Sequence, residues 1–465
     1  MRKSLFFSLF FVLFAQLLFG QTVQNNALEQ FKDEKFGMFL HWGLYAQTAG
    51  DWQGHKVKGG EHFMLYERIP VNEYATIANQ FNPIQFDADL WVKQAKETGM
   101  KYIVFTAKHH DGFAMYNSAS SDYNIVKRSP FKRDPISELA KACKKYKIQL
   151  CLYYSLGRDW QDPDVPTNWP VKAGRSNTWD YPNEDAKVFN RYFERKVKPQ
   201  LTELLSNYGP IGAIWFDTPE LISKMESTAL KALVNKLQPN CLINNIIGNG
   251  YGDFSISEQS LSPSSKKAWE SCLTIGQNWG YNKHDSVWKS PEMLVRHLVE
   301  VVANGGNLLL NVGPKGDGTF PDWAIARLKA VGKWMDINHE AIYASQPWLA
   351  VKENSTQKSD NISIEESKNA IKDAVFDGTP KSVTPDIYYT AKDKNVYVFL
   401  RSWQKPGVLL KQINKSRLSV KNIELLGNSK KIKWTINNEG LSLDLPSDYD
   451  KGIQIPVYVL KITTN

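Results

Sequence analysis

Between about residues 30 and 345, short apolar runs alternate with longer amphipathic ones, a pattern typical of parallel strands covered by helices. We predict six buried strands, at 36–41, 102–107, 149–154, 212–217, 241–245 and 307–312. Helical periodicity predicts helices at 87–98, 135–146, 185–207, 221–237, 291–303 and 323–338. Six strands over about 315 residues favour an α/β fold, a (β/α)8-like barrel with long loops and one or two helices missing, over an open doubly wound sheet.

Polar side chains stand at the ends of several of these strands. His41 ends the first, the run Lys108-His109-His110-Asp111 follows the second, and Asp217 ends the fourth. Each alone could be an ordinary strand exit, since Asp, Asn and His are common at turns. Because the carboxyl ends of the strands of a parallel barrel line one pocket, several together predict an active site there.

The two ends of the chain differ from the middle. Residues 1–20 carry Arg2 and Lys3 before an apolar run, which predicts a signal peptide and export to the periplasm or the cell exterior. That run is shorter than the roughly 20 apolar residues of a membrane-spanning helix, so we expect no membrane association. Strand-like runs after residue 345 predict an antiparallel β-sandwich that buttresses the barrel or binds carbohydrate. The predicted domains are 1–20, 21–347 and 348–465.

Composition excludes several classes of function. The 57 basic and 48 acidic residues are interspersed, so the net charge of +9 indicates solubility and not nucleic-acid binding. No glycine-rich dinucleotide or phosphate loop follows a strand, so no cofactor is expected. The four scattered cysteines predict buried thiols and form no metal-type pair. Most of the fifteen tryptophans would fill the core, although such rings also stack on sugars. The oligomeric state is not indicated.

Asp217 is the best candidate for a nucleophile. Glycoside hydrolysis uses two carboxyl groups, one as nucleophile or base and one as an acid whose pKa is raised. Asp217 ends an apolar run, so a buried strand would deliver its carboxylate to the barrel mouth. The alternative is an Asp that forms a side-chain turn before Pro219.

The second carboxylate is less defined by the sequence. Glu258 closes the segment 252–258, which we expect to be a loop after the fifth strand, and Asp253 and Glu270 are its rivals. Sequence separation does not choose among the three. It also leaves the stereochemistry open, since retaining enzymes hold the carboxyl groups about 5–5.5 Å apart and inverting ones about 6.5–9.5 Å.

The histidines at strand ends could bind sugar hydroxyls or a metal ion. Neighbouring residues on a strand point to opposite faces, so His109 and His110 should not both ligate one ion. No spaced histidine pair of the metal-binding type accompanies them. We therefore expect no metal site.

Several motifs together resemble the α-L-fucosidases of glycoside hydrolase family 29. They lie at 35–43, 95–124, 215–217, 252–258, 269–272, 279–281 and 305–314. The resemblance implies an exo-acting retaining enzyme without a cofactor that releases terminal α-L-fucose from fucosylated oligosaccharides or glycoconjugates. It makes Asp217 the nucleophile and Glu258 the acid/base. The sugar-binding positions that carry over are His41, His109, His110, Tyr154 and Trp279.

The chain departs from the family pattern at one position. Family members usually have Glu-Trp after the first strand, whereas this chain has Glu61 followed by His62. Glu61 would bind sugar hydroxyls, and the smaller His62 could relax specificity toward galactose-type sugars with a hydroxymethyl group at C5. Alternatively, Trp52 in the neighbouring loop could supply the missing aromatic wall. The rival functions are a galactosidase-type exo-glycosidase and a non-catalytic carbohydrate-binding protein.

Overall fold

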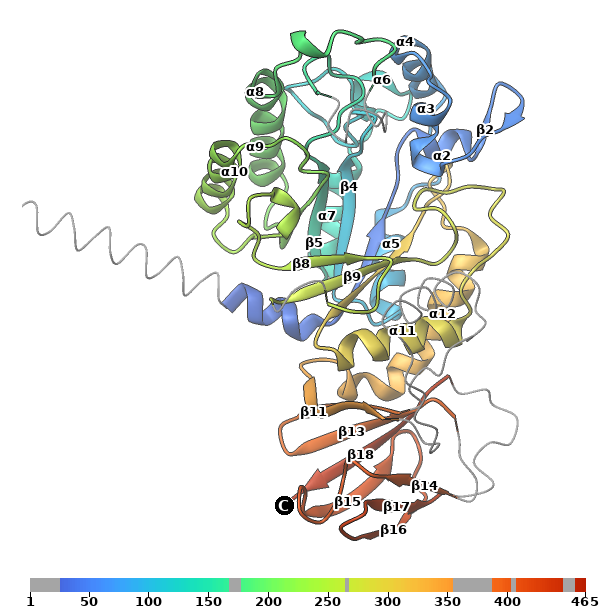
Figure 1. The fold of residues 1–465 in the computed structure, drawn as a ribbon. Coiled ribbons are helices and arrows are strands. Elements are labelled where there is room, and N and C mark those ends of the chain that lie inside the picture. Colours follow the sequence, from blue (N-terminus) through green and yellow to red (C-terminus); the bar gives the residue numbers. More distant parts are fainter. Residues whose placement is uncertain (1–25, 167–176, 264–266, 354–386, 403–406, 446–455) are drawn as a thin grey trace, which may run out of the picture.

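A computed structural model describes residues 26–166, 177–263, 267–353, 387–402, 407–445 and 456–465. Figure 1 shows a barrel of strands and helices above a smaller β-domain coloured orange to red. The predicted signal peptide at 1–20 lies outside the described residues.

Eight parallel strands form one curled sheet in the order β7-β6-β5-β4-β1-β10-β9-β8. Their bounds are β1 Phe36–Leu40, β4 Tyr102–Lys108, β5 Gln149–Ser155, β6 Ala213–Asp217, β7 Leu242–Ile243, β8 Ser255–Glu258, β9 Trp269–Thr274 and β10 Asn307–Val312. A parallel bridge between Asn244 and Phe254 joins the two edges, and the Asn245 N–H donates to the Phe254 carbonyl at 2.8 Å. The (β/α)8-like barrel is therefore confirmed.

Each of the six predicted strands is present, but β8 and β9 were not predicted. Their sequences, Ser-Ile-Ser-Glu and Trp-Glu-Ser-Cys-Leu-Thr, mix polar and apolar residues and lack the continuous apolar run that marks the other strands. The expectation of a loop at 252–258 is wrong for its last four residues, because Glu258 ends strand β8.

Within the described ranges, six helices of ten or more residues lie around this sheet. They are α5 Ala88–Glu97, α7 Pro135–Tyr146, α9 Lys198–Asn207, α10 Lys224–Leu237, α11 Pro291–Ala303 and α12 Asp322–Asn338. The Asp134 carboxylate caps α7, and Ser223 with Glu226 forms a capping box on α10. Among the described residues, no helix has the length and apolar character needed to cross a membrane.

The single helix predicted at 185–207 is interrupted. A 3-10 turn at Glu184–Ala186 is followed by α8 (Phe189–Tyr192), a π-helical turn at Phe193–Val197, and then α9. Pro199 at the start of α9 has no N–H, so it cannot donate to the carbonyl four residues earlier. The helix accommodates this loss with a wider turn.

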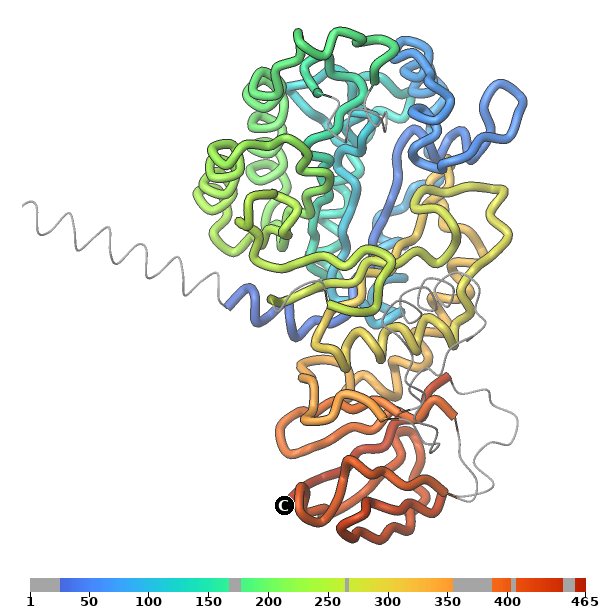
Figure 2. Tube along the Cα trace, viewed as in Figure 1, coloured from blue at the N-terminus to red at the C-terminus, as the bar shows by residue number. Residues whose placement is uncertain are grey.

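At the end where the strands begin, the barrel interior is largely aromatic and apolar, and it encloses the carboxyl of Glu270. A helix at 26–34 closes this end: the Phe31 ring lies 5.7 Å from that of Tyr102 and 4.6 Å from that of Phe254. Asn307, the first residue of β10, donates to the Phe31 carbonyl at 2.6 Å. In Figure 2 this helix is the dark blue segment beside the barrel. All four cysteines are buried free thiols, as predicted.

The C-terminal domain is an antiparallel β-sandwich, as predicted. One sheet contains β11 Gln346–Glu353, β12 Ile387–Lys392, β13 Asn395–Leu400, β18 Tyr458–Thr464 and β15 Val420–Leu425, and the other contains β14 Gly407–Leu410, β17 Leu441–Asp444 and β16 Lys433–Ile436. One apolar core joins the two sheets. The indole N–H of Trp334 on α12 donates to the Val457 carbonyl at 2.8 Å, so the sandwich buttresses the barrel helices; carbohydrate binding stays a prediction.

A buried ion network supports the segment after β5. The Asp159 carboxylate lies 3.0 Å from Lys108 Nζ and 2.7 Å from Lys196 Nζ, and Lys108 also donates to the Tyr192 hydroxyl at 2.6 Å. Burial alone would raise the pKa of Asp159, but the two lysines hold it below its ordinary value. The carboxylate therefore stays ionised between two buried cations.

We expect Asp159→Asn to lower the free energy of unfolding by about 3–5 kcal/mol, because it leaves two buried lysines without a carboxylate. Urea unfolding followed by tryptophan fluorescence measures the change. Asp122→Asn, which removes a solvent-exposed partner of Lys127, is the matched control and should leave the midpoint of urea unfolding almost unchanged. Equal effects of the two substitutions would contradict the network's role.

Candidate active site

Side chains from six segments of the chain meet at the carboxyl ends of the barrel strands. His41 follows β1, His109 and His110 follow β4, Asp217 ends β6, and Glu258 ends β8. Two further groups arrive on loops, Glu61 and His62 on a 3-10 turn at Gly60–His62 and Trp279 after β9. The predicted residues are thus gathered at one end of the barrel, with the exception of Tyr154.

The carboxylate of Asp217 is held in place and remains accessible. The Tyr153 hydroxyl donates to Oδ2 at 2.7 Å, and His110 Nε2 lies 3.6 Å from the same oxygen. The side chain is 30% exposed. The alternative of a side-chain turn fails, because a bond to the residue two positions on needs an N–H that Pro219 lacks.

Burial raises the pKa of Asp217 above its ordinary value. The Tyr153 hydrogen bond, the Arg158 charge, the Thr218 N–H and His62 oppose this shift in that order. The ionised form is therefore favoured by groups on several different elements, which suits a nucleophile that must be charged when substrate arrives.

Glu258 has the electrostatic surroundings of a proton donor. Burial raises its pKa, the negative charges of Asp217 and Glu61 raise it further, and His62 and a hydrogen bond with Trp279 lower it less. Neighbouring groups surround the carboxyl on most sides, but the side chain keeps access to solvent at the barrel mouth. The protonated form of Glu258 beside an ionised Asp217 is the arrangement that acid-assisted glycoside cleavage requires.

The hydrogen bonds of His110 define which of its nitrogens carries the proton. His110 Nδ1 lies 2.6 Å from Ser155 Oγ, and that hydroxyl donates its own proton to the Arg158 carbonyl at 2.8 Å. Ser155 must therefore accept from His110 Nδ1–H. Burial lowers the pKa of His110 well below its ordinary value, so the ring is neutral and Nε2 is a hydrogen-bond acceptor.

The tautomer of His41 is also fixed by its hydrogen bonds. Asn311 uses its amide nitrogen to donate to the Trp279 carbonyl at 2.7 Å, so its Oδ1 accepts from His41 Nδ1 at 2.8 Å. Burial lowers the pKa of His41 to about 4. Its Nε2 is consequently an acceptor too, suited to a sugar hydroxyl.

Glu61 is a fixed anionic acceptor. It accepts from the Gly280 N–H at 3.0 Å and from His62 Nδ1 at 3.1 Å. Burial would raise its pKa, but His62, His41 and the Gly280 N–H outweigh burial and hold the pKa below the ordinary value. The carboxylate is ionised at neutral pH.

Aromatic rings form the wall around these groups. The partly exposed Trp279 ring lies 5.0 Å from the His41 ring, and Trp160 lies 5.9 Å from the His62 ring. Trp52 instead packs on Phe63 at 5.8 Å, and none of its ring contacts within the described residues is with the site. The suggestion that Trp52 replaces the missing indole therefore receives no support, and relaxed specificity through His62 stays a prediction.

Both His109 and His110 face the site, which corrects the expectation that they point to opposite faces. Strand β4 ends at Lys108, so the alternation of a strand does not extend to them, and their ring centroids are 4.3 Å apart. His109 stacks on Tyr153 at 5.4 Å with an interplanar angle of 11°. In the part of the chain that the structure describes, no group of three or more His, Cys, Asp or Glu is placed to hold a metal.

Tyr154 lies outside the site, and Tyr153 takes its place. The Tyr154 hydroxyl donates to Gln200 on α9 at 2.8 Å, on the helix side of the sheet. Ser155 pairs with Asp217 across β5 and β6, and Tyr153 pairs with Trp215. Because side chains alternate along a strand, Tyr153 shares the inner face with Asp217, and only the register of β5 against β6 identifies it.

The two rival acids lie elsewhere in the barrel. Glu270 is enclosed in the interior, where it accepts from the Tyr102 hydroxyl at 2.6 Å and the Trp215 indole at 2.8 Å, and burial raises its pKa to about 7. Asp253 accepts from the Ile243 N–H at 2.9 Å and pairs with Lys231 of α10 at 3.2 Å. Of the three candidates, only Glu258 ends a strand at the mouth.

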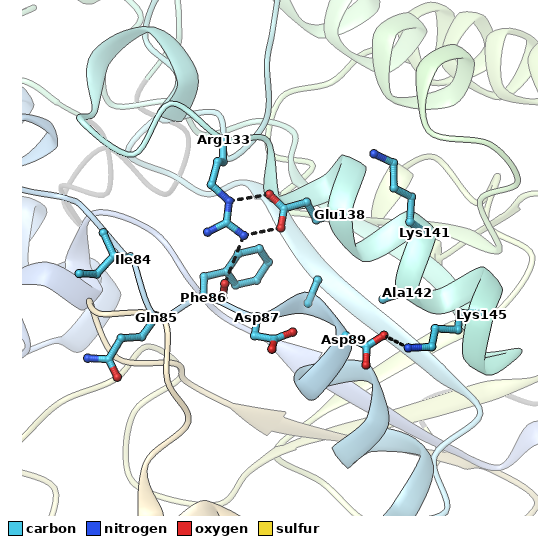
Figure 3. Close-up of a pocket in the computed structure, with 11 residues that line it drawn as sticks. Ile84, Gln85, Phe86, Asp87, Asp89, Arg133, Glu138, Lys141, Ala142 and Lys145 are labelled. Atoms are coloured by element: carbon cyan, nitrogen blue, oxygen red, sulfur yellow. Dashed lines mark hydrogen bonds and ion pairs between the residues drawn. The ribbon is translucent and has the colours of Figure 1, made fainter.

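A surface hollow of about 600 Å³ lies apart from these residues, between the starts of α5 and α7. Figure 3 shows two ion pairs among its lining residues, Arg133 with Glu138 and Lys145 with Asp89. None of the candidate site residues lines it. The chemistry of the molecule is therefore assigned to the barrel mouth.

Comparison with known proteins agrees with this geometry. The family model described as Alpha-L-fucosidase matches residues 19–340, and the model of the Alpha-L-fucosidase C-terminal domain matches residues 380–463. The chain belongs to the α-L-fucosidase family. It is therefore a glycoside hydrolase, and the fucosidase hypothesis is supported over the galactosidase-type and non-catalytic alternatives.

Individual relatives share both domains or the barrel. The plasma alpha-L-fucosidase of Homo sapiens is 29% identical over 445 residues, covering 90% of this chain and 85% of its own. The structure of alpha-L-fucosidase isoenzyme 1 from Paenibacillus thiaminolyticus has a TM-score of 0.80 at 30% identity and covers 95% of this chain and 100% of its own. The alpha-L-fucosidase AlfC from Lactobacillus casei, in complex with α-L-fucose product, is 41% identical with a TM-score of 0.64, covering 67% and 98%.

Tyr153→Phe removes the donor to Asp217, so kcat/KM on an aryl α-L-fucoside should fall on the order of tenfold or more. The acid limb of the pH profile should move to higher pH, because the hydrogen bond lowers the pKa of Asp217. Tyr154→Phe loses contacts on the helix side of the sheet, the bond to Gln200 among them, and is the matched control, with kcat/KM near that of the wild type. Steady-state kinetics across pH on both variants provide the measurement. A larger loss of kcat/KM in Tyr154→Phe than in Tyr153→Phe would contradict the assignment of Tyr153 to the site.

Proposed function

We propose that this α-L-fucosidase releases terminal α-L-fucose by double displacement, with Asp217 as nucleophile and Glu258 as acid/base. The observation that carries the proposal is the pair of carboxyl groups at the ends of β6 and β8, close enough for the charge of Asp217 to raise the pKa of Glu258. Retention of configuration follows from attack by the protein carboxylate itself.

In the first step, an Asp217 oxygen bonds to C1 of the fucose as the bond from C1 to the leaving oxygen breaks. Glu258 gives its proton to that oxygen. The ester on Asp217 is uncharged, so the repulsion that raised the pKa of Glu258 disappears. Glu258 then accepts a proton from water, which attacks C1 and regenerates the Asp217 carboxylate.

The neutral histidines and Glu61 supply the hydroxyl contacts. His41 and His110 each offer Nε2 as an acceptor, and the carboxylate of Glu61 accepts further hydroxyl protons. The Trp279 ring provides an apolar face for the sugar. These acceptors suit the terminal fucose of fucosylated oligosaccharides or glycoconjugates, and the enzyme from Lactobacillus casei has been solved with Fuca(1,6)GlcNAc and with 4-nitrophenyl fucoside.

The two carboxyl groups predict opposite limbs of the pH profile. Activity needs ionised Asp217, so it should fall on the acid side as Asp217 gains a proton, above the usual range of an Asp because burial raises its pKa. It also needs protonated Glu258, so it should fall on the basic side above the usual range of a Glu. Because Asp217 and Glu258 interact, the two limbs give apparent pKa values that belong to the pair of carboxyl groups.

Hydrolysis of 4-nitrophenyl α-L-fucoside tests the two assignments. Asp217→Ala should lower kcat on the order of a thousandfold or more, because the nucleophile is lost. Glu258→Gln should be far more damaging on an oligosaccharide than on the aryl fucoside, because nitrophenolate departs without a proton. Asp253→Asn removes a rival carboxylate and should keep near-normal rates. An Asp217→Ala enzyme of undiminished activity, or an inactive Asp253→Asn enzyme, would refute the assignments.

We also propose that the chain is exported, because Arg2 and Lys3 precede an apolar run in residues 1–20. Expression of the full chain in a bacterial host should place fucosidase activity in the periplasm or medium, with the mature N-terminus near Gln21. A variant lacking residues 2–20 is the control and should stay in the cytoplasm. N-terminal sequencing that finds Met1 on a cytoplasmic full-length product would contradict export.

A further inference from the structure

The chain segments after β5 and β6 are bound together beyond the ends of the two strands. We call residues 156–160 the β5 loop and residues 218–222 the β6 loop. The Leu156 N–H donates to the Asp217 carbonyl at 2.9 Å, and the Gly157 N–H donates to the Thr218 carbonyl at 2.7 Å. The pairing of Ser155 with Asp217 therefore continues into the loops.

The approach of the two loops depends on a glycine. A Cβ added at Gly157 would lie 2.5 Å from the Thr218 carbonyl oxygen and 2.9 Å from Glu220 Cβ. The β6 loop itself departs from favoured geometry, since Thr218 has φ 51° and Glu220 has φ 44°. A β-branched residue is rarely found in this left-handed region, so surrounding contacts must hold it there.

An ion pair spans the same two loops. Arg158 of the β5 loop pairs with Glu220 of the β6 loop, and their side chains are only 11% and 5% exposed. The Arg158 carbonyl accepts from Ser155, whose hydroxyl in turn accepts from His110. Arg158 is thus connected by its side chain to the β6 loop and by its backbone to the histidine beside Asp217.

The guanidinium charge also reaches the nucleophile. Asp217 is faced by Tyr153 of β5, Arg158, His110 after β4, His62 and Glu258 of β8. Of these, Arg158 is the permanent cation, because its guanidinium does not lose its proton in the working range of an enzyme. The principal influences on Glu258 are burial, Asp217, Glu61, His62 and Trp279.

We propose that Arg158 is a positioning residue for the nucleophile: paired with Glu220, it holds the β6 loop against the β5 loop and keeps a fixed positive charge beside Asp217. The inference rests on the proposed function, because Arg158 acts through Asp217. Glu220 serves to orient the guanidinium, which would otherwise be free to turn toward solvent. The position of the nucleophile and the charge that favours its ionised form are then set by one side chain.

The test compares pH profiles of kcat/KM on 4-nitrophenyl α-L-fucoside for the wild type, Arg158→Gln and Arg158→Lys. Arg158→Gln should lower kcat/KM on the order of ten- to a hundredfold at the optimum. Its acid limb should move to higher pH while the basic limb stays, because the charge acts on Asp217. Arg158→Lys, which keeps a cation, should restore the position of the acid limb in part.

Lys231→Gln is the matched control, since Lys231 forms a comparable partly buried ion pair with Asp253 away from the site. It should leave both limbs unmoved. If the thermal transition shows that Arg158→Gln does not fold, Gly157→Ala tests the inference instead. The added Cβ forces the two loops apart, so kcat should fall by at least about tenfold while the chain stays folded.

If the wild type is active and Arg158→Gln has the same acid limb, the inference is overturned and the proposed function stands. The same conclusion follows if Arg158→Gln does not fold and Gly157→Ala has normal activity. A wild type that does not hydrolyse the fucoside would overturn both. The same loss of activity at every pH in Arg158→Gln and Arg158→Lys would assign Arg158 a structural role only and would also overturn the inference.

Discussion

The register between β5 and β6 is the constraint on which the active site depends. Ser155 stands opposite Asp217 and Tyr153 opposite Trp215, so these side chains share the inner face of the barrel. Tyr153 can then donate to the Asp217 carboxylate, and Ser155 can fix His110. A shift of one residue in β5 would place Tyr154 in the barrel instead of Tyr153, and the same shift in β6 would turn Phe216 inward and remove the nucleophile from its pocket.

Burial of two carboxyl groups side by side determines the electrostatics of the site. Removing water raises the pKa values of Asp217 and Glu258, so two carboxyl groups compete for ionisation. Hydrogen bonds and the Arg158 guanidinium favour the ionised form of Asp217, whereas the anions Asp217 and Glu61 favour the protonated form of Glu258. The same coupling lets Glu258 change from acid to base once Asp217 is esterified.

Much of the fold could be predicted because buried parallel strands are continuous apolar runs. Strands β1, β4, β5, β6, β7 and β10 have this signature, whereas β8 and β9 carry Ser, Glu and Thr and were missed. The position of Asp217 followed from its strand. The choice of Glu258 over Asp253 and Glu270 did not, because sequence separation says nothing about which barrel end or face a carboxylate occupies.

Contacts between distant segments explain the remaining differences. Tyr153 was overlooked for Tyr154 because the parity of β5 relative to β6 is a tertiary property. The alternation rule misplaced His109 and His110 because β4 ends one residue before them. Arg158 and Glu220 gave no local signal, since their pairing arises only when two loops meet.

Identification of the residue that becomes covalently bound to fucose tests the central claim most directly. The Glu258→Gln enzyme would be treated with a fucosyl donor that has a good leaving group and fluorine at C2, then digested and mapped by mass spectrometry. We predict a fucosyl ester on Asp217. A label on Glu61 or any other carboxylate, or turnover without a covalent species, would contradict the account.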